Sequence, residues 1–181
     1  MTMMYSMHQS GFWNLERQTN LLDGAAHFYD TYECKDGKYV SIGSIEPQFY
    51  ALLCEKAELS QDEFGDQMKR DTWQNKKQLI KNVFLTKTRE EWCELMEGSD
   101  VCFAPVLDMS EAPMHPHNIA RQTFIEIEGV TQPAPAPRFD RTQNEITLPP
   151  AIAGEHSKEI LESIGIDSNE YDRLISSGSV V

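Results

Sequence analysis

The feature that most constrains the fold is a pair of strand-like runs joined by a tight turn. Residues 28–34 and 39–43 are rich in aromatic and β-branched side chains, and Asp36-Gly37 lies between them. An Asp-Gly pair between two such runs is the strongest short-range indication of a β-hairpin, because glycine adopts a positive φ without steric cost. Alternation along the first run places four side chains on one face, namely Phe28, Asp30, Tyr32 and Cys34. The sequence therefore predicts a hairpin.

A strand-to-helix junction follows the hairpin. The segment Ser44-Ile45-Glu46-Pro47 ends the second run, and Pro47 suits the first position of a helix that covers residues 48–59. Glu46 therefore falls at or near the helix N-cap. Two interpretations of it remain open: a carboxylate that satisfies free amide groups, or a catalytic carboxylate displayed at the junction. A helix N-terminus favours the ionised form, so a catalytic Glu46 would orient or polarise a neighbouring base rather than donate a proton.

The rest of the chain predicts short helices and strands. Thr88-Arg89-Glu90-Glu91 has the pattern of a capping box, and five of the nine prolines in residues 131–150 indicate an extended linker. The expected helices cover 62–70, 72–85, 89–97, 110–112, 116–121, 155–164 and 168–176, and the expected strands cover 101–106 and 124–130.

These patterns predict an α+β fold in four segments. A Met-rich connecting segment (1–24) precedes a small α+β domain (25–130), a proline-rich linker (131–152) and C-terminal helices (153–181). The last two helices share an apolar stripe for which the preceding chain offers no obvious partner surface. Its members are Ile160, Leu161, Ile164, Leu174 and Ile175.

The beginning of the chain is rich in methionine. Met1, Met3, Met4 and Met7 are half of the eight methionines and precede the apolar residues Phe12 and Trp13. Methionine side chains are flexible and fill irregular apolar spaces. The segment is therefore either an ordinary helix packed on the core or an adaptable wall for an apolar ligand.

Composition excludes several classes of function. With 16 Lys and Arg against 29 Asp and Glu, the net charge is −13, which argues against nucleic-acid binding and against gripping a polyphosphate with this chain alone. The four cysteines form no CxxC and are expected to be packed, free thiols in a reducing compartment. His115-Pro116-His117 lacks a third ligand, so no metal is expected. No apolar run approaches the length of a membrane span, and we expect a soluble, intracellular chain.

A set of short motifs runs along nearly the whole chain. They are Asn20–Gly24, Phe28–Tyr32, Asp36–Tyr39, Gly43–Tyr50, Asp100–Val106, His115–Arg121, Gln132–Phe139, Gly154–Ser157, Leu161–Gly165 and Ser177-Gly178. Together these motifs resemble the α-methylacyl-CoA racemases of the class III CoA-transferase superfamily. The segment from Gly43 to Tyr50, which surrounds Glu46, is the most specific, and residues 60–90 are the least similar.

The resemblance implies that the chain corresponds to the C-terminal half of a family member. The fold would be the small domain of the class III CoA-transferase fold, with an N-terminal connecting helix, a proline-rich return linker and C-terminal helices that dock on a large domain. That large domain would hold most of the CoA and would carry the catalytic His and Asp of the racemases. Two subunits would interlock as a homodimer, with the active site between one large domain and the other small domain.

By position, the resemblance assigns Glu46 a place beside the catalytic pair and assigns Met1, Met3, Met4 and Met7 to an apolar surface for the acyl chain. The implied reaction is epimerisation of 2-methyl-branched acyl-CoA thioesters, without a cofactor, in the cytoplasm or in the peroxisome or mitochondrion of a eukaryote. The chain alone is expected to be inactive. Two alternatives stay open: a class III CoA-transferase, although the glycine-rich loop of some transferases is absent, and a truncated or split interaction domain without catalysis.

Overall fold

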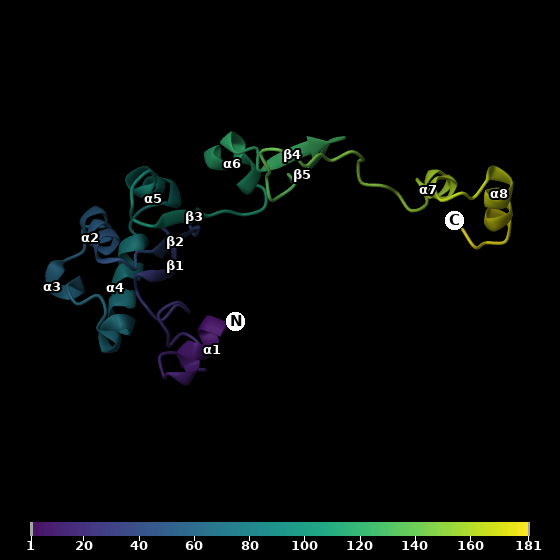
Figure 1. Cartoon of the computed structure of the whole chain (residues 1–181). Helices are drawn as coiled ribbons and strands as arrows, with labels where there is room; N and C mark the ends of the chain where they lie inside the picture. The colour runs from purple at the N-terminus through teal and green to yellow at the C-terminus, as the bar shows by residue number, and fades with distance from the viewer. Residues whose placement is uncertain (1, 181) are drawn as a thin grey trace. The chain divides into compact units, whose positions relative to one another are not determined.

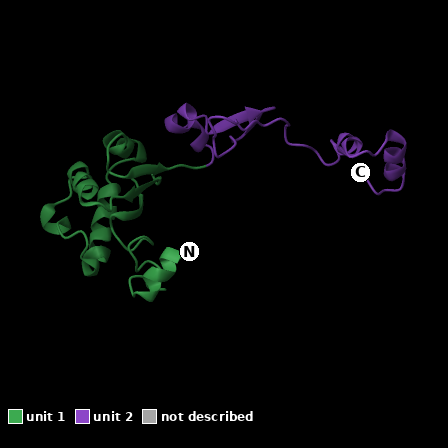
Figure 2. Cartoon of the chain, in the orientation of Figure 1, with its two compact units in different colours: residues 1–108 green, residues 109–181 purple. Residues whose placement is uncertain are grey.

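The chain divides after Asp108 into two compact units (Figure 2). The structure is a computed structural model that describes residues 2–180. Figure 1 labels the helices and strands along the chain. Among the described residues, all of the buried side chains belong to the first unit, and the second contains a small hairpin and the C-terminal helices.

A three-stranded antiparallel sheet forms the centre of the first unit. Its strands are β1 (Tyr29–Glu33), β2 (Tyr39–Gly43) and β3 (Phe103–Val106), in the order β1-β2-β3. Tyr32 pairs with Val40, and Gly37 takes a φ of 75° in the turn. The predicted hairpin is confirmed. Of the four side chains predicted to share one face, Phe28, Tyr32 and Cys34 are buried.

Helices cover the buried face of this sheet. They are α2 (Pro47–Lys56), α3 (Gln61–Phe64), α4 (Trp73–Phe84) and α5 (Arg89–Met96), with a 3₁₀ turn η1 (Arg70–Thr72) before α4. Helix α4 packs against β1, and α5 packs against β3. Aromatic rings join these layers, since Phe84 stacks on Tyr32 at 5.2 Å between ring centroids and meets Trp92 edge-on at 5.0 Å.

One predicted helix in this unit is wrong. Residues 62–70 were expected to form a single helix, but α3 ends at Phe64 and residues 65–69 form a loop. The Lys76 ammonium donates a hydrogen bond to the Asp66 carbonyl at 2.7 Å, and the Trp73 indole donates one to the Gln67 carbonyl at 2.8 Å. These side-chain bonds satisfy backbone carbonyls that a continuing helix would have satisfied internally.

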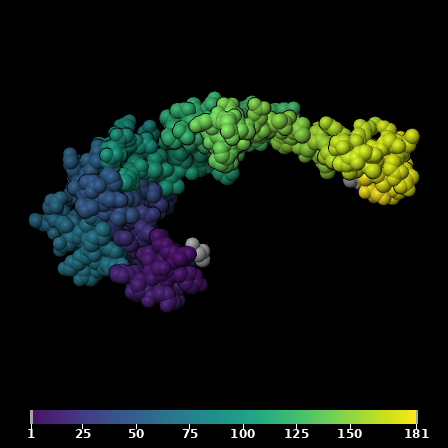
Figure 3. All heavy atoms as spheres, viewed as in Figure 1, coloured from purple at the N-terminus to yellow at the C-terminus, as the bar shows by residue number. Residues whose placement is uncertain are grey.

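Helix α1 (Thr2–Gln9) begins the described chain and buries no residue. Its residues form part of the purple surface in Figure 3. The Met7 carbonyl accepts the amide hydrogens of Phe12 and Trp13 at 2.8 and 3.1 Å, which turns the chain back after the helix. This part of the unit is therefore held by local backbone contacts rather than by a core.

The second unit begins with η2 (Ala112–Met114) and α6 (Pro116–Ala120) and then forms a β-hairpin. Strands β4 (Phe124–Ile127) and β5 (Val130–Pro133) pair antiparallel, with Phe124 opposite Pro133. The sequence analysis missed β5, whose residues it assigned to the expected strand and to the proline-rich segment. The unit ends with α7 (Ser157–Ser163) and α8 (Ser168–Ser176), neither of which has a buried residue.

Within residues 2–180, no helix is both long enough and apolar enough to cross a lipid bilayer.

Candidate functional site

Glu46 lies in the junction between β2 and α2, directly before the first residue of the helix. It is the N-cap residue, with an extended backbone (φ −70°, ψ 142°), and Pro47 follows at the start of the helix. The Tyr50 amide donates the first helical hydrogen bond to the Glu46 carbonyl at 3.0 Å. The predicted N-cap position is confirmed. The Glu46 side chain, however, is exposed and makes no capping hydrogen bond, so the interpretation as an amide-satisfying carboxylate is wrong.

Four long-range hydrogen bonds hold the two residues that precede Glu46, in addition to a local one from the Ile45 amide to the Gly43 carbonyl at 2.9 Å. The Ser44 amide donates to the Phe28 carbonyl at 3.0 Å, and the Ser44 hydroxyl donates to the Val101 carbonyl. The Gln67 side-chain amide donates to the Ser44 and Ile45 carbonyls, at 2.9 Å each. The junction is therefore rigid while the carboxylate that it displays is free of local partners. Sequence reasoning missed Gln67, because a glutamine in a polar stretch carries no signal of a contact 22 residues away.

Cys102 lies close enough to Glu46 for their charges to interact. Partial burial raises the pKa of the Cys102 thiol, and the negative charges of Glu46 and Asp100 raise it further. The residue is exposed and adopts a positive φ of 57° just before β3. Packed thiols were predicted, and Cys34 and Cys54 are buried, but the prediction is wrong for Cys102 because this backbone turn directs it outward.

A hollow of about 450 Å³ lies beside the strands of the central sheet. Asp30 at its edge forms an ion pair with Lys77 of α4, whose ammonium also donates to the Gly24 carbonyl. Small, aliphatic and aromatic residues line this hollow, together with the carboxylates of Asp23 and Asp30 and the Cys102 thiol. The residues are Leu22, Asp23, Gly24, Tyr29, Asp30, Thr31, Ser41, Ile42, Gly43, Cys102, Phe103 and Ala104.

The predicted acyl-binding methionines lie on and beside α1. Met3 is 65% exposed, and Met4 lines an apolar hollow of about 460 Å³ together with Tyr5, His8, Gln9, Trp13 and Leu15. Met7 is half-buried, and Met1 lies outside the described residues. An exposed apolar hollow of this kind is able to cover a flexible hydrocarbon chain. The binding role of these methionines stays a prediction.

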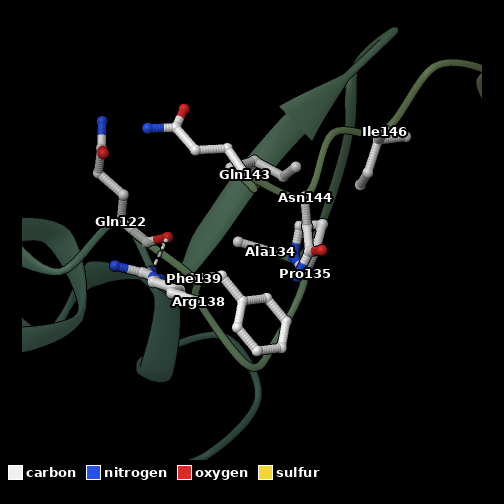
Figure 4. A pocket seen from close by; sticks show the side chains of 9 residues that line it. Gln122, Ala134, Pro135, Arg138, Phe139, Gln143, Asn144 and Ile146 are labelled. Carbon is white, nitrogen blue, oxygen red and sulfur yellow. Dashed lines mark hydrogen bonds between the residues drawn. The ribbon is translucent and has the colours of Figure 1, made fainter. Parts of the chain in front are cut away.

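The second unit has its own hollow, of about 380 Å³, behind the β4–β5 hairpin (Figure 4). Arg138 donates a hydrogen bond to the Gln122 carbonyl at 2.8 Å, and Asn144 donates one to the Pro137 carbonyl at 2.6 Å. Figure 4 shows the ring of Phe139 beside Pro135 in this hollow. Arg138 thus ties the proline-rich segment to the chain just before β4, whereas the Asn144 bond lies within that segment.

Of the two histidines in the His115-Pro116-His117 motif, His115 caps a helix. His115 is the N-cap of α6, and its Nδ1 accepts the His117 amide hydrogen at 3.3 Å. Across the residues that the structure describes, no three His, Cys, Asp or Glu side chains gather as metal ligands.

The sequence of the chain matches a known protein family. Residues 1–157 match the model of CoA-transferase family III. The chain belongs to this family.

Among curated family relatives, two alpha-methylacyl-CoA racemases are similar to the chain along nearly its whole length. The mouse protein is 38% identical over 96% of this chain, and the human protein is 38% identical over 98% of it. The human succinyl-CoA:glutarate CoA-transferase is 28% identical over 84%. The chain spans 48% of the length of each racemase, so it corresponds to about half of a complete relative.

A solved structure matches the fold. The crystal structure of the hypothetical protein Rv3272 from Mycobacterium tuberculosis superimposes with a TM-score of 0.60 at 20% identity, and covers 87% of this chain and 43% of that one. The mixed helix and strand architecture is therefore the class III CoA-transferase fold, as predicted. At this identity the match supports the fold alone.

Proposed function

We propose that the chain is part of an enzyme that epimerises 2-methyl-branched acyl-CoA thioesters. The observation that carries the proposal is the 38% identity to two alpha-methylacyl-CoA racemases along 96–98% of the chain. Proteins named as CoA transferases reach only 24–30% identity and cover 70–84% of it. The segment around Glu46, which carries the most specific resemblance, is also held by hydrogen bonds from Gln67 to the Ser44 and Ile45 carbonyls.

The chemistry requires proton removal and return at one carbon. The thioester carbonyl makes the α-hydrogen acidic, a base on one face removes it, and an acid on the other face returns a proton to the enolate. We assign the base and acid to the half of the fold that this chain does not span. Glu46 would act as an anion that orients or polarises the base, because its carboxylate is exposed and has no capping partner.

The rest of the substrate would be divided between the two halves. A chain with a net charge of −13 is a poor site for the CoA phosphates, which the other half would hold. The apolar hollow at α1, with Met4 and its neighbours, would cover the acyl chain. The CoA thioester is substrate, and no resident cofactor is proposed. We expect a homodimer in a compartment that keeps thiols reduced: the cytoplasm, or the peroxisome or mitochondrion of a eukaryote.

Deuterium exchange tests this proposal. A chiral 2-methylacyl-CoA is incubated in deuterated water with the chain alone, and with the chain joined to a polypeptide that carries the rest of the family fold. We expect α-deuterium incorporation only from the combined protein. Glu46→Gln should lower its kcat by about 100-fold, as expected for loss of a group that assists proton transfer.

The matched control is Glu55→Gln, which changes an exposed glutamate on the same helix α2 and should leave kcat unchanged. Incorporation by the chain alone would refute the division of labour. Equal activity of Glu46→Gln and Glu55→Gln would remove Glu46 from the mechanism. No incorporation by any combination would favour a non-catalytic interaction domain.

The relatives named as transferases favour one second candidate, a CoA-transferase. Such an enzyme moves CoA from one acid to another, so it requires a free carboxylic acid as the acceptor. The same combined protein is therefore supplied with an acyl-CoA and a second, labelled acid. Appearance of the labelled acyl-CoA without α-deuterium would replace the racemase proposal with the transferase one.

A further inference from the structure

We propose that Gln67 is a positioning residue that fixes where the Glu46 carboxylate is displayed; this inference rests on the function proposed above. The juxtaposition that points to it is one buried side-chain amide shared by two successive carbonyls of the Glu46 junction. The Gln67 Nε2 lies 2.9 Å from the carbonyl oxygen of Ser44 and 2.9 Å from that of Ile45.

These two carbonyls help to determine the direction of the Glu46 side chain. The Ile45 carbonyl belongs to the rigid peptide plane that ends at the Glu46 Cα. Holding both carbonyls therefore holds the two peptide planes before Glu46. The direction of its Cα–Cβ bond then depends on the Glu46 φ of −70°, and the Tyr50 amide holds the Glu46 carbonyl on the other side, at the start of α2. The Glu46 carboxylate makes no capping hydrogen bond of its own. The position of this carboxylate therefore depends mainly on the backbone that carries it.

Gln67 is itself held from behind by α4. The buried Trp73 donates its indole hydrogen to the Gln67 carbonyl at 2.8 Å, and the buried Lys76 donates to the neighbouring Asp66 carbonyl at 2.7 Å. The loop that carries Gln67 is therefore attached to α4 at two consecutive carbonyls. A continuous line of contacts runs from α4 through the loop and the Gln67 amide to the junction.

The other side of the junction has an independent attachment. The Ser44 hydroxyl donates to the Val101 carbonyl, and the Gly43 amide donates to the Cys102 carbonyl at 2.8 Å. These bonds join the junction to the segment that leads into β3. Because Ser44 keeps its own bonds without Gln67, loss of the Gln67 amide should release the orientation of the Ile45–Glu46 peptide without detaching the strand.

The first test uses the whole 181-residue chain and reads the position of Glu46 through Cys102. Alkylation of Cys102 by iodoacetamide is followed by peptide mass spectrometry between pH 7 and 9.5. Because the Glu46 charge raises the pKa of this thiol, Glu46→Gln should increase its alkylation rate below the pKa. Gln67→Met keeps the length and the apolar packing of the side chain but removes the donor. In that background, the rate increase caused by Glu46→Gln should fall by at least about half, since contacting groups are coupled.

Tyr50→Phe is the matched control. It removes a buried hydroxyl that donates to the Phe64 carbonyl at 2.9 Å, so it disturbs the same core without touching the junction carbonyls. The Glu46→Gln effect on Cys102 should keep its full size in this background. An undiminished effect in the Gln67→Met background would overturn the inference. If Gln67→Met does not fold, Gln67→Glu serves instead, because its ionised side chain also lacks the donor.

The second test uses the combined protein of the deuterium-exchange assay. Gln67→Met should lower kcat by about 10-fold while KM stays within about 2-fold, because the substrate is still bound but the carboxylate is misplaced. Tyr50→Phe should change neither constant. Normal kcat in Gln67→Met, with activity lost in Glu46→Gln, would sink this inference and leave the proposed function standing. Full activity in Glu46→Gln would instead sink the proposed role of Glu46, whatever the outcome at Cys102.

Discussion

His27 shows how a single polar residue is accommodated in the core of the first unit. Its ring is fully buried, and its Nε2 lies 2.7 Å from the Tyr50 hydroxyl, which donates its own hydrogen to the Phe64 carbonyl. The Nε2 must therefore carry the proton and donate. The Nδ1 has no hydrogen-bond partner within residues 2–180. Burial, with a smaller contribution from the nearby Lys76 charge, lowers the pKa of His27 to about 3.

This lowered pKa predicts that the first unit loses stability in acid. The unfolded chain binds a proton at His27 below its ordinary pKa of 6.5, whereas the folded chain stays neutral down to about pH 3. Stability is therefore fully present above pH 6.5 and falls as the pH drops from 6.5 toward 3. At pH 5 the loss from this residue should be about 2 kcal/mol, measured as the free energy of urea unfolding at pH 7 and at pH 5.

A pair of variants isolates that contribution. His27→Phe removes the titrating group, so the difference between pH 7 and pH 5 should shrink by about 2 kcal/mol, although the variant is less stable at both. His117→Gln changes an exposed histidine and should keep the wild-type difference. Equal pH dependence in His27→Phe and wild type would show that folding does not lower the pKa of His27.

At the scale of elements, Thr88 makes the best-defined helix cap of the first unit. Its hydroxyl accepts the Glu91 amide hydrogen at 3.3 Å, and the Glu91 carboxylate accepts the Thr88 amide hydrogen at 2.7 Å. This is the capping box that the sequence predicts at the start of α5. Thr88→Ala should therefore lower the free energy of unfolding by about 1 kcal/mol, measured by urea denaturation at pH 7.

Ser60 supplies the control for this prediction. It is the N-cap of α3, but its side chain makes no capping hydrogen bond, so Ser60→Ala should change the stability by less than about 0.5 kcal/mol. A Thr88→Ala variant that is as stable as Ser60→Ala would show that the hydrogen bonds of the capping box do not stabilise the folded chain.

Local chemistry explains which elements could be predicted. The hairpin around Gly37 joins two runs that are neighbours in the sequence, and the start of α2 and the cap of α5 depend on residues within four positions of each other, so their signals are complete in the local sequence. The loop at 65–69 and strand β5 could not be found in this way. The loop depends on donors from α4, and β5 gains its identity from pairing with β4 in a segment whose prolines suggest a linker.

The same distinction applies to the candidate site. The sequence predicts Glu46 at the start of a helix because Pro47 follows it, and the structure places it there. Gln67 and Cys102 could not be predicted, since each reaches the junction through tertiary contacts that leave no local pattern. The resemblance to a family implied a role for Glu46, whereas the hydrogen bonds that hold its backbone could be seen only in the folded structure.

For the whole molecule, the distribution of burial is uneven. All of the fully buried apolar side chains belong to the first unit, where α4 and α5 cover one face of the sheet. The described residues of the second unit include none in the buried class. Since hydrophobic burial supplies most of the stability of a folded domain, the first unit should account for nearly all of the cooperative unfolding of this chain.

This distribution predicts that the C-terminal helices are weakly protected in the chain alone. Ile160, Ile164 and Ile175 are 58%, 71% and 40% exposed, so their apolar stripe is not covered. Amide hydrogen exchange on the dilute monomer should therefore be fast across residues 157–176 and slow in α4.

Ile164→Glu should leave the unfolding of the first unit unchanged, whereas Ile80→Ala, at a fully buried position of α4, should lower its free energy of unfolding by about 2–5 kcal/mol. Addition of the other half of the family fold should slow the exchange of α7 and α8, because only a partner surface is able to remove these side chains from water. Strong protection of the two helices in the dilute monomer would contradict this account.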